Sequence, residues 1–182
     1  MGRPKAMLPL PGGQLLVEYV AGVVMEAGRW LDDVVLLGSS KSLPDSLADL
    51  PVLADAEPGA GPLAGLASLL QFAGKRWSLL VACDLPLLEL RLLERLHAAL
   101  RQDRDAVAFR RTDQSTAWHA CCAFYHPRLL PDVRCELGKG NRSLQNLLAK
   151  ARAIALHPTP DEERMLLNLN LPDDYDRLLR SD

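Results

Sequence analysis

The sequence predicts an α/β fold in three layers, with a mainly parallel but mixed sheet between two layers of helices. Short apolar runs rich in β-branched residues alternate along the chain with stretches of helical hydrophobic spacing, the pattern of strands joined by crossover helices. The strands are apolar throughout, so both faces of the sheet should be covered. The 182 residues, 48% of them hydrophobic, fit a single domain over residues 1–182.

Hydrophobic spacing and turn residues give the bounds of the expected elements. Strands are expected at residues 34–37, 51–54, 78–82, 106–109 and 121–125, with weaker candidates at 153–156 and 166–169. Helices are expected at residues 15–27, 63–72, 88–100 and 142–151, the last with Asn141 as its N-cap.

Composition excludes several classes of protein. The net charge is −2, from 21 basic and 23 acidic residues, whereas a general nucleic-acid binder or a binder of anionic membranes needs a positive surplus. The four cysteines form no CxxC pair and are expected to be free thiols. No apolar run reaches the roughly 18 residues of a membrane span, and the N-terminus has no secretory pattern. We therefore expect a cytoplasmic protein that binds neither nucleic acid nor membrane.

Ligands of such folds bind at the carboxyl ends of the strands, and Asp84 lies there. It follows the apolar run Val81-Ala82-Cys83, and Pro86 turns the chain away. A lone carboxylate without a nearby His or Cys suits Mg²⁺, which keeps several waters and shares its remaining positions with phosphates. The open alternative is that Asp84 caps the next helix.

A glycine-rich loop follows the strand at residues 51–54. It reads Asp55-Ala-Glu-Pro-Gly-Ala-Gly61-Pro62-Leu63-Ala-Gly65 and leads into a helix. Exposed N–H groups and the helix dipole at such a start favour an anion or the edge of a nucleotide base. An ordinary tight connection between strand and helix is the alternative.

Two further stretches carry polar groups. Asn168 and Asn170 alternate along the last candidate strand and so should point to one face, although Asn170 could simply cap the next helix. Lys139 and Arg142 lie in a glycine-containing turn before a helix, where they could hold a phosphate or stay solvated. Together with Lys5, these groups suggest a site for a nucleoside triphosphate and Mg²⁺, because nucleotidyl transfer needs a metal and cations more than acid–base groups.

The order of motifs MGRPK, DAEPGAGPLAGLASLL, CDLP, GNRSLQNLL and NLNLPDDY resembles that of the MobA-type nucleotidyltransferases over essentially the whole chain. The resemblance implies a Rossmann-like nucleotidyltransferase fold. It also implies the transfer of GMP from GTP to molybdopterin, with Mg²⁺ as cofactor, and contact with molybdoenzymes or other cofactor-biosynthesis proteins.

The resemblance assigns a role to each candidate residue. Lys5 and Asp84 take the catalytic positions, and Asp84 with Asn170 takes the metal site. The nucleotide site comprises Lys5, Asp55, Gly61, Pro62 and Leu63. The second-substrate site comprises Asn168, Asn170, Lys139 and Arg142.

The opening stretch departs from the family motif LAGGxSxRMGxxK. Residues 1–5, MGRPK, match only its end, and the strand and glycine loop that precede it in the family are absent from this sequence. One interpretation is a start codon assigned at the internal methionine of the motif. The other is a truncated relative.

Two rival functions remain open on the sequence. One is a related enzyme that uses CTP for molybdopterin or acts on sugar phosphates. The other is a non-catalytic relative that binds molybdopterin or acts like a chaperone. A comparison of nucleotides would distinguish the first, and loss of turnover the second.

Overall fold

The computed structural model describes residues 5–38, 43–55, 61–111 and 117–169. Its strands are β1 (Leu36–Leu37), β2 (Val52–Leu53), β3 (Ser78–Val81), β4 (Ala106–Arg110), β5 (Trp118–Tyr125) and β6 (Ala153–Leu156). Its α-helices are α1 (Leu16–Glu26), α2 (Pro62–Ala73), α3 (Leu90–Ala98), α4 (Leu130–Gly138), α5 (Leu144–Lys150) and α6 (Pro160–Met165). The longest described helix, α2, has 12 residues, well short of the roughly 20 needed to cross a bilayer, and none of the described helices qualifies as a membrane span.

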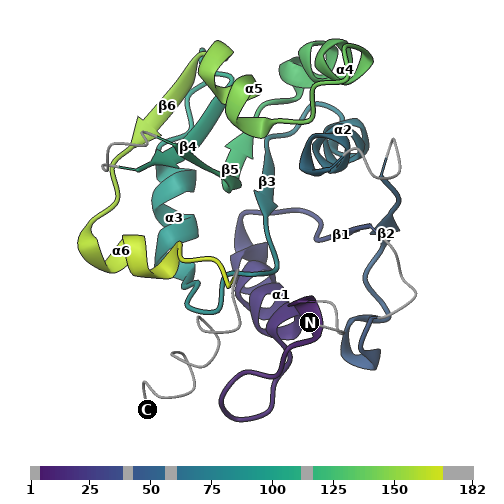
Figure 1. Ribbon diagram of the computed structural model, residues 1–182, viewed down its shortest axis with the longest axis vertical. Helices are drawn as coiled ribbons and strands as arrows, with labels where there is room; N and C mark the ends of the chain where they lie inside the picture. The colour runs from purple at the N-terminus through teal and green to yellow at the C-terminus, as the bar shows by residue number, and fades with distance from the viewer. Residues whose placement is uncertain (1–4, 39–42, 56–60, 112–116, 170–182) are drawn as a thin grey trace.

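The described strands form one four-stranded sheet and one separate pair (Figure 1). The larger sheet has the order β3-β5-β4-β6, in which β5 is antiparallel to both neighbours and β4 is parallel to β6. The strands β1 and β2 pair in parallel by themselves. The prediction of an α/β fold with a mixed sheet is confirmed, while the single domain over residues 1–182 stays a prediction.

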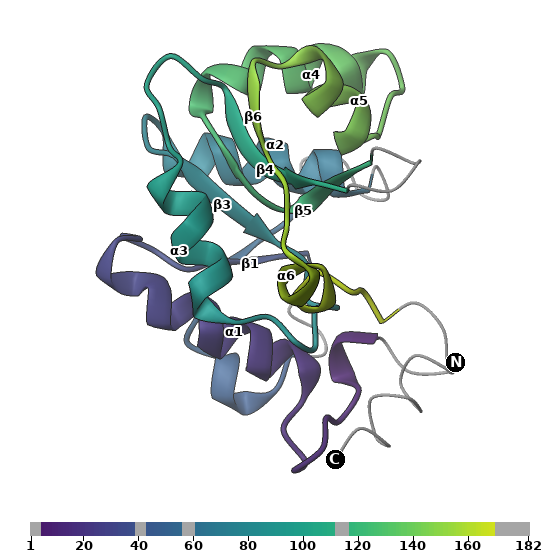
Figure 2. The same cartoon turned by 90° about the vertical axis from the view of Figure 1, so that its left-hand side faces the viewer.

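Helices cover both faces of the four-stranded sheet, as the continuously apolar strands predict. Figure 2 shows α2, α4 and α5 on one side and α1, α3 and α6 on the other. Odd-numbered residues at the end of β5, such as Ala123 and Tyr125, pack in the core under α2, α4 and α5. The even-numbered Cys122 and Phe124 pack in the core beside α1, α3 and α6. The period of two along the strand thus divides its side chains between two cores.

The chain between residues 157 and 169 differs from the prediction. The prediction of a strand at residues 166–169 is wrong, because this segment pairs with no strand and follows a helix, α6, that was not predicted. The Thr159 hydroxyl accepts a hydrogen bond from the Glu162 N–H, and the Glu162 carboxylate accepts one from the Thr159 N–H, which is a capping box. Pro160 occupies the first helical position, where its missing N–H costs nothing.

The helices on the other face of the sheet, α4 and α5, also differ from the prediction. Helix α4 was not predicted, and α5 is capped by Ser143, whose hydroxyl accepts a hydrogen bond from Asn146 N–H. The predicted cap, Asn141, instead accepts a hydrogen bond from Ser143 N–H. The helix therefore begins two residues later than the sequence indicated.

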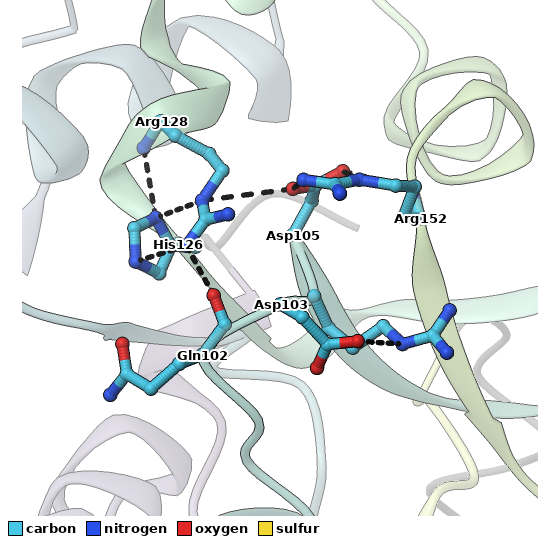
Figure 3. Close-up of polar contacts among 7 residues, drawn as sticks. Gln102, Asp103, Asp105, His126, Arg128 and Arg152 are labelled. Atoms are coloured by element: carbon cyan, nitrogen blue, oxygen red, sulfur yellow. Dashed lines mark hydrogen bonds and ion pairs between the residues drawn. The ribbon is translucent and has the colours of Figure 1, made fainter.

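An ion cluster lies at the amino end of β4 (Figure 3). The Asp105 carboxylate accepts hydrogen bonds from the Arg152 backbone N–H at 3.0 Å and from the Arg152 guanidinium at 2.9 and 3.1 Å. The Arg128 guanidinium lies 3.7 Å from Asp105 and also donates to Nδ1 of His126 at 2.9 Å. The Arg152 hydrogen bonds, with Arg128 contributing, hold the pKa of Asp105 below its usual range. The cluster ties the start of β6 to the start of β4.

Candidate functional site

A cleft of about 1020 Å³ lies between β1 and β3. It is lined mainly by apolar side chains, which come from both strands, from α1 and from α2. Lys5, Asp55, Gly61 and Asp84 are among the residues that line it. The volume is at the upper end of the range usual for small-molecule pockets, so a nucleotide fits.

Asp84 occupies the carboxyl end of β3, as predicted. The strand pairing continues beyond Val81, since Ala82 N–H donates to the Cys121 carbonyl at 2.7 Å. Helix α3 begins six residues after Asp84, with Glu89 at its N-cap position. The alternative of a helix-capping role for Asp84 is therefore wrong, and its half-buried carboxylate is available to a ligand.

Asn168 lies beside Asp84 even though 84 residues separate them. Its amide Nδ2 donates to Asp84 Oδ1 at 3.1 Å, and the next residue, Leu169, donates its N–H to the Asp84 carbonyl at 3.0 Å. These two bonds attach the segment after α6 to the end of β3. The predicted neighbour Asn170 lies outside the described residues.

The nucleotide-loop candidates flank the same cleft. Gly61, just before α2, has φ of 71°, a conformation that glycine adopts without strain. Within α2, a Cβ on Gly65 would lie 3.5 Å from Asp55 Oδ1 and 3.4 Å from Leu37 Cδ1. Ser68 Oγ donates to the Ala54 carbonyl at 2.8 Å. The absent side chain and this hydrogen bond together hold α2 against the end of β2, beside Asp55.

Charges at this end of the cleft act on two cysteines. Burial raises the pKa of Cys83, with a smaller contribution from Asp84, while Lys5 lowers it. Lys5 and Asp84 therefore both lie near Cys83. Burial, with Asp84 adding to it, raises the pKa of Cys121 to about 11. Both thiols are protonated and poorly nucleophilic near neutral pH, and both are free, as the sequence predicted.

The remaining candidates lie elsewhere. Leu63 is fully buried in the core under α2, so its side chain cannot reach a nucleotide and only its backbone could contribute. Lys139 and Arg142 lie in the loop between α4 and α5 and do not line the cleft. The Lys139 ammonium is 3.6 Å from the Glu136 carboxylate.

Sequence reasoning missed contacts that place this loop. The Gln145 amide accepts a hydrogen bond from Trp118 N–H at 2.8 Å and donates to the Trp118 carbonyl at 2.6 Å. The Arg110 guanidinium lies over the Trp118 ring, 5.2 Å from its centroid.

A further contact that sequence reasoning missed lies on the opposite face of the sheet. There, His119 Nε2 is 3.5 Å from the Glu163 carboxylate. Such pairs lie far apart in sequence and leave no local signal.

No group of three or more His, Cys, Asp or Glu side chains could hold a metal within the described parts of the chain. A zinc centre of that kind is thus not seen there. A single carboxylate with an adjacent amide matches the donor set of Mg²⁺, which takes one or two carboxylates and completes its shell with water and phosphate oxygens.

Comparison with known proteins gives the family. Residues 1–155 match the model of the MobA-like NTP transferase domain. A probable molybdenum cofactor guanylyltransferase of Synechococcus elongatus is 33% identical, over 98% of this chain and 91% of its own. The molybdenum cofactor guanylyltransferase of Pseudomonas entomophila is 31% identical, over 94% of this chain and 87% of its own.

A solved structure has the same fold. The molybdopterin-guanine dinucleotide biosynthesis protein A of Archaeoglobus fulgidus superposes with a TM-score of 0.75 at 20% identity, over 97% of this chain and 89% of its own. The predictions of family, fold and nucleotidyltransferase type are confirmed by these findings. The match over residues 1–155 and the similarity to these relatives show that this chain belongs to the MobA-like NTP transferases.

Proposed function

We propose that this protein transfers GMP from GTP to molybdopterin, forming the guanine dinucleotide and releasing pyrophosphate. The observation that carries the proposal is the Asp84–Asn168 pair, in which Asp84 lines the same cleft as Gly61 at the start of α2. Family membership supplies the reaction type, and the similar proteins named guanylyltransferases supply the nucleotide.

Asp84 and Asn170 are proposed to hold Mg²⁺, and Asn168 is proposed to orient the Asp84 carboxylate. When bound, the ion would offset phosphate charge at the α-phosphorus. Asn168 donates an amide hydrogen to one carboxylate oxygen of Asp84. That hydrogen bond fixes the carboxylate rotamer, and a fixed ligand loses less freedom when a cation binds.

Lys5, Asp55 and the start of α2 are proposed to bind GTP. Asp55 would accept hydrogen bonds from the guanine edge, while Gly61, Pro62 and the Leu63 backbone border the nucleotide. A phosphate oxygen of molybdopterin would form a bond to the α-phosphorus of GTP, and the bond to the β-phosphate oxygen would break. Lys5 would stabilise the charge that accumulates on the phosphates in that step.

The second substrate, molybdopterin, is proposed to contact Asn168, Asn170, Lys139 and Arg142. We also propose that the protein works in the cytoplasm, where it would pass its product to molybdoenzymes or other cofactor-biosynthesis proteins. A CTP-specific enzyme and a non-catalytic relative are less well supported, because the similar proteins are guanylyltransferases and a pure binder has no use for a metal ligand at Asp84.

The test is Asp84→Ala, measured as pyrophosphate release with GTP, Mg²⁺ and molybdopterin. Turnover should fall roughly 1000-fold, since several kcal/mol of transition-state stabilisation depend on the metal. Asp103→Ala is a matched control, because Asp103 is an exposed acid paired with Arg104 just before the amino end of β4, away from the carboxyl end of β3 where Asp84 lies. Equal rates in both variants, or turnover with CTP in preference to GTP, would refute the proposal.

A further inference from the structure

Glu136 is a buried acid at the end of α4 that lies outside the site described above. Only 8% of the residue is exposed. Its carboxylate accepts hydrogen bonds from Lys150 Nζ at 2.9 Å and from Asn141 Nδ2 at 2.6 Å, and Lys139 Nζ lies at 3.6 Å. The hydrogen bond from Lys150 makes the largest contribution, followed by that from Asn141, and together they lower the pKa of Glu136 to about 2. The acid therefore stays ionised throughout the neutral range.

The Glu136 contacts order the loop of residues 139–143. Asn141 donates its backbone N–H to the Glu136 carbonyl at 2.9 Å, so it is attached to that residue by both backbone and side chain. The Asn141 Oδ1 atom then accepts the Ser143 N–H at 3.1 Å. Arg142 is exposed, and the residues on both sides of it are anchored. The backbone of Arg142 is thereby fixed.

The same loop is tied to the edge of the sheet where Asp84 lies. The Ser143 hydroxyl caps α5, and Gln145 in the first turn of α5 bonds both backbone groups of Trp118. Trp118 begins β5, and three residues later the Cys121 carbonyl accepts a hydrogen bond from Ala82 N–H, two residues before Asp84 in the chain. Hydrogen bonds and short chain segments thus connect the loop held by Glu136 to the carboxyl end of β3, where Asp84 lies.

We propose that Glu136 is a positioning residue that holds Arg142 for the phosphate of the second substrate. This inference rests on the function proposed above. A guanidinium binds a phosphate best through two parallel N–H bonds, which requires a defined backbone position. Burying a carboxylate is unfavourable unless it is paired, and the three partners of Glu136 all belong to this loop or to α5. Glu136 acts through Arg142 and does not touch the substrate.

The variant Glu136→Gln tests the inference with nearly unchanged shape. We expect the KM for molybdopterin, at saturating GTP and Mg²⁺, to rise about tenfold, because a displaced contact weakens binding. The KM for GTP should stay within about twofold, since no GTP contact changes. Glu94→Gln is the control: it breaks the exposed Arg29–Glu94 ion pair on the far face and should alter neither constant.

A second variant separates positioning from general damage. In Glu136→Gln combined with Asn141→Asp, the new amide can donate to the new carboxylate, and the negative charge stays between Lys139 and Lys150. We expect the double variant to recover most of the lost affinity for molybdopterin. Absence of any turnover in the unaltered protein would refute the proposed function and this inference with it. Turnover with an unchanged KM for molybdopterin in Glu136→Gln, or an equal rise in both KM values that the double variant does not reverse, would overturn the inference alone.

Discussion

The contact between α2 and Asp55 makes a prediction at Gly65. A Cβ at this position would lie 3.4 Å from Leu37 Cδ1 and 3.5 Å from Asp55 Oδ1, at the limit of ordinary van der Waals contact. Alanine therefore fits with little movement, whereas the two methyl groups of valine extend into the space of Leu37 or of the Asp55 carboxylate. Gly22, in the interior of α1, is a matched control, because a Cβ there meets no atom within 4 Å.

The expected magnitudes follow from these contacts. Gly→Ala in a helix interior raises the free energy of unfolding by about 0.5–1 kcal/mol, which is roughly 1–4 °C in Tm for a protein of this size. Gly22→Ala and Gly65→Ala should both show this gain. Gly65→Val should instead lose about 1–3 kcal/mol through overpacking, while Gly22→Val should stay near the unaltered protein.

The assay combines thermal unfolding with calorimetric titration of GTP and Mg²⁺. In Gly65→Val the affinity for GTP should fall at least about tenfold, because the displaced carboxylate loses roughly 1.4 kcal/mol or more of binding free energy. Both Gly22 variants should bind GTP normally. If Gly65→Val binds GTP like the unaltered protein and matches Gly22→Val in Tm, then α2 does not hold Asp55 in the way described.

Two further predictions concern stability. Burial lowers the pKa of His126, and the nearby positive charge of Arg128 lowers it further. The imidazole therefore binds a proton more readily in the unfolded chain than in the folded protein. Unfolding free energy should therefore fall as pH drops through about 6.5, and His126→Gln should remove that part of the pH dependence in denaturant titrations. Tyr125 is fully buried, and its hydroxyl donates to the Ala120 carbonyl at 2.7 Å. Tyr125→Phe should cost about 1–3 kcal/mol by leaving that carbonyl without its partner, and an unchanged urea midpoint would contradict this.

The sequence predicted the elements whose local signals agree with their packing. Strands β3 and β4 are continuous apolar runs buried in the sheet, and α3 places Leu92, Leu93 and Leu96 on its buried face. Helix α6 carried a readable signal, Thr159-Pro160-Asp161-Glu162, but its apolar content is too low to show a helical period. Because that helix was missed, the segment with Asn168 was assigned to a strand.

The parts of the candidate site that lie just after strands could be predicted from the sequence. Asp55 and Asp84 could be selected because each follows a short apolar strand, and the structure places both on one cleft. The hydrogen bond from Asn168 to Asp84 was not predictable from spacing, since the contact depends on how α6 packs. Glu136 gave no signal either, because an acid near a helix end is ordinary until its three partners are brought to it by the fold.

The two ends of β3 carry different contacts, although both line the cleft. Trp77 precedes the strand and packs edge-on against His126, with ring centroids 4.9 Å apart, while Asp84 follows the strand at its other end. Seven residues of near-extended chain span roughly 20 Å, beyond the 7–10 Å within which substitutions usually couple. The effects of substitutions at His126 and of substitutions at Asp84 on the free energy of unfolding should therefore be additive. The amino end of β3 can therefore be altered for stability without disturbing Asp84 at the other end of the strand.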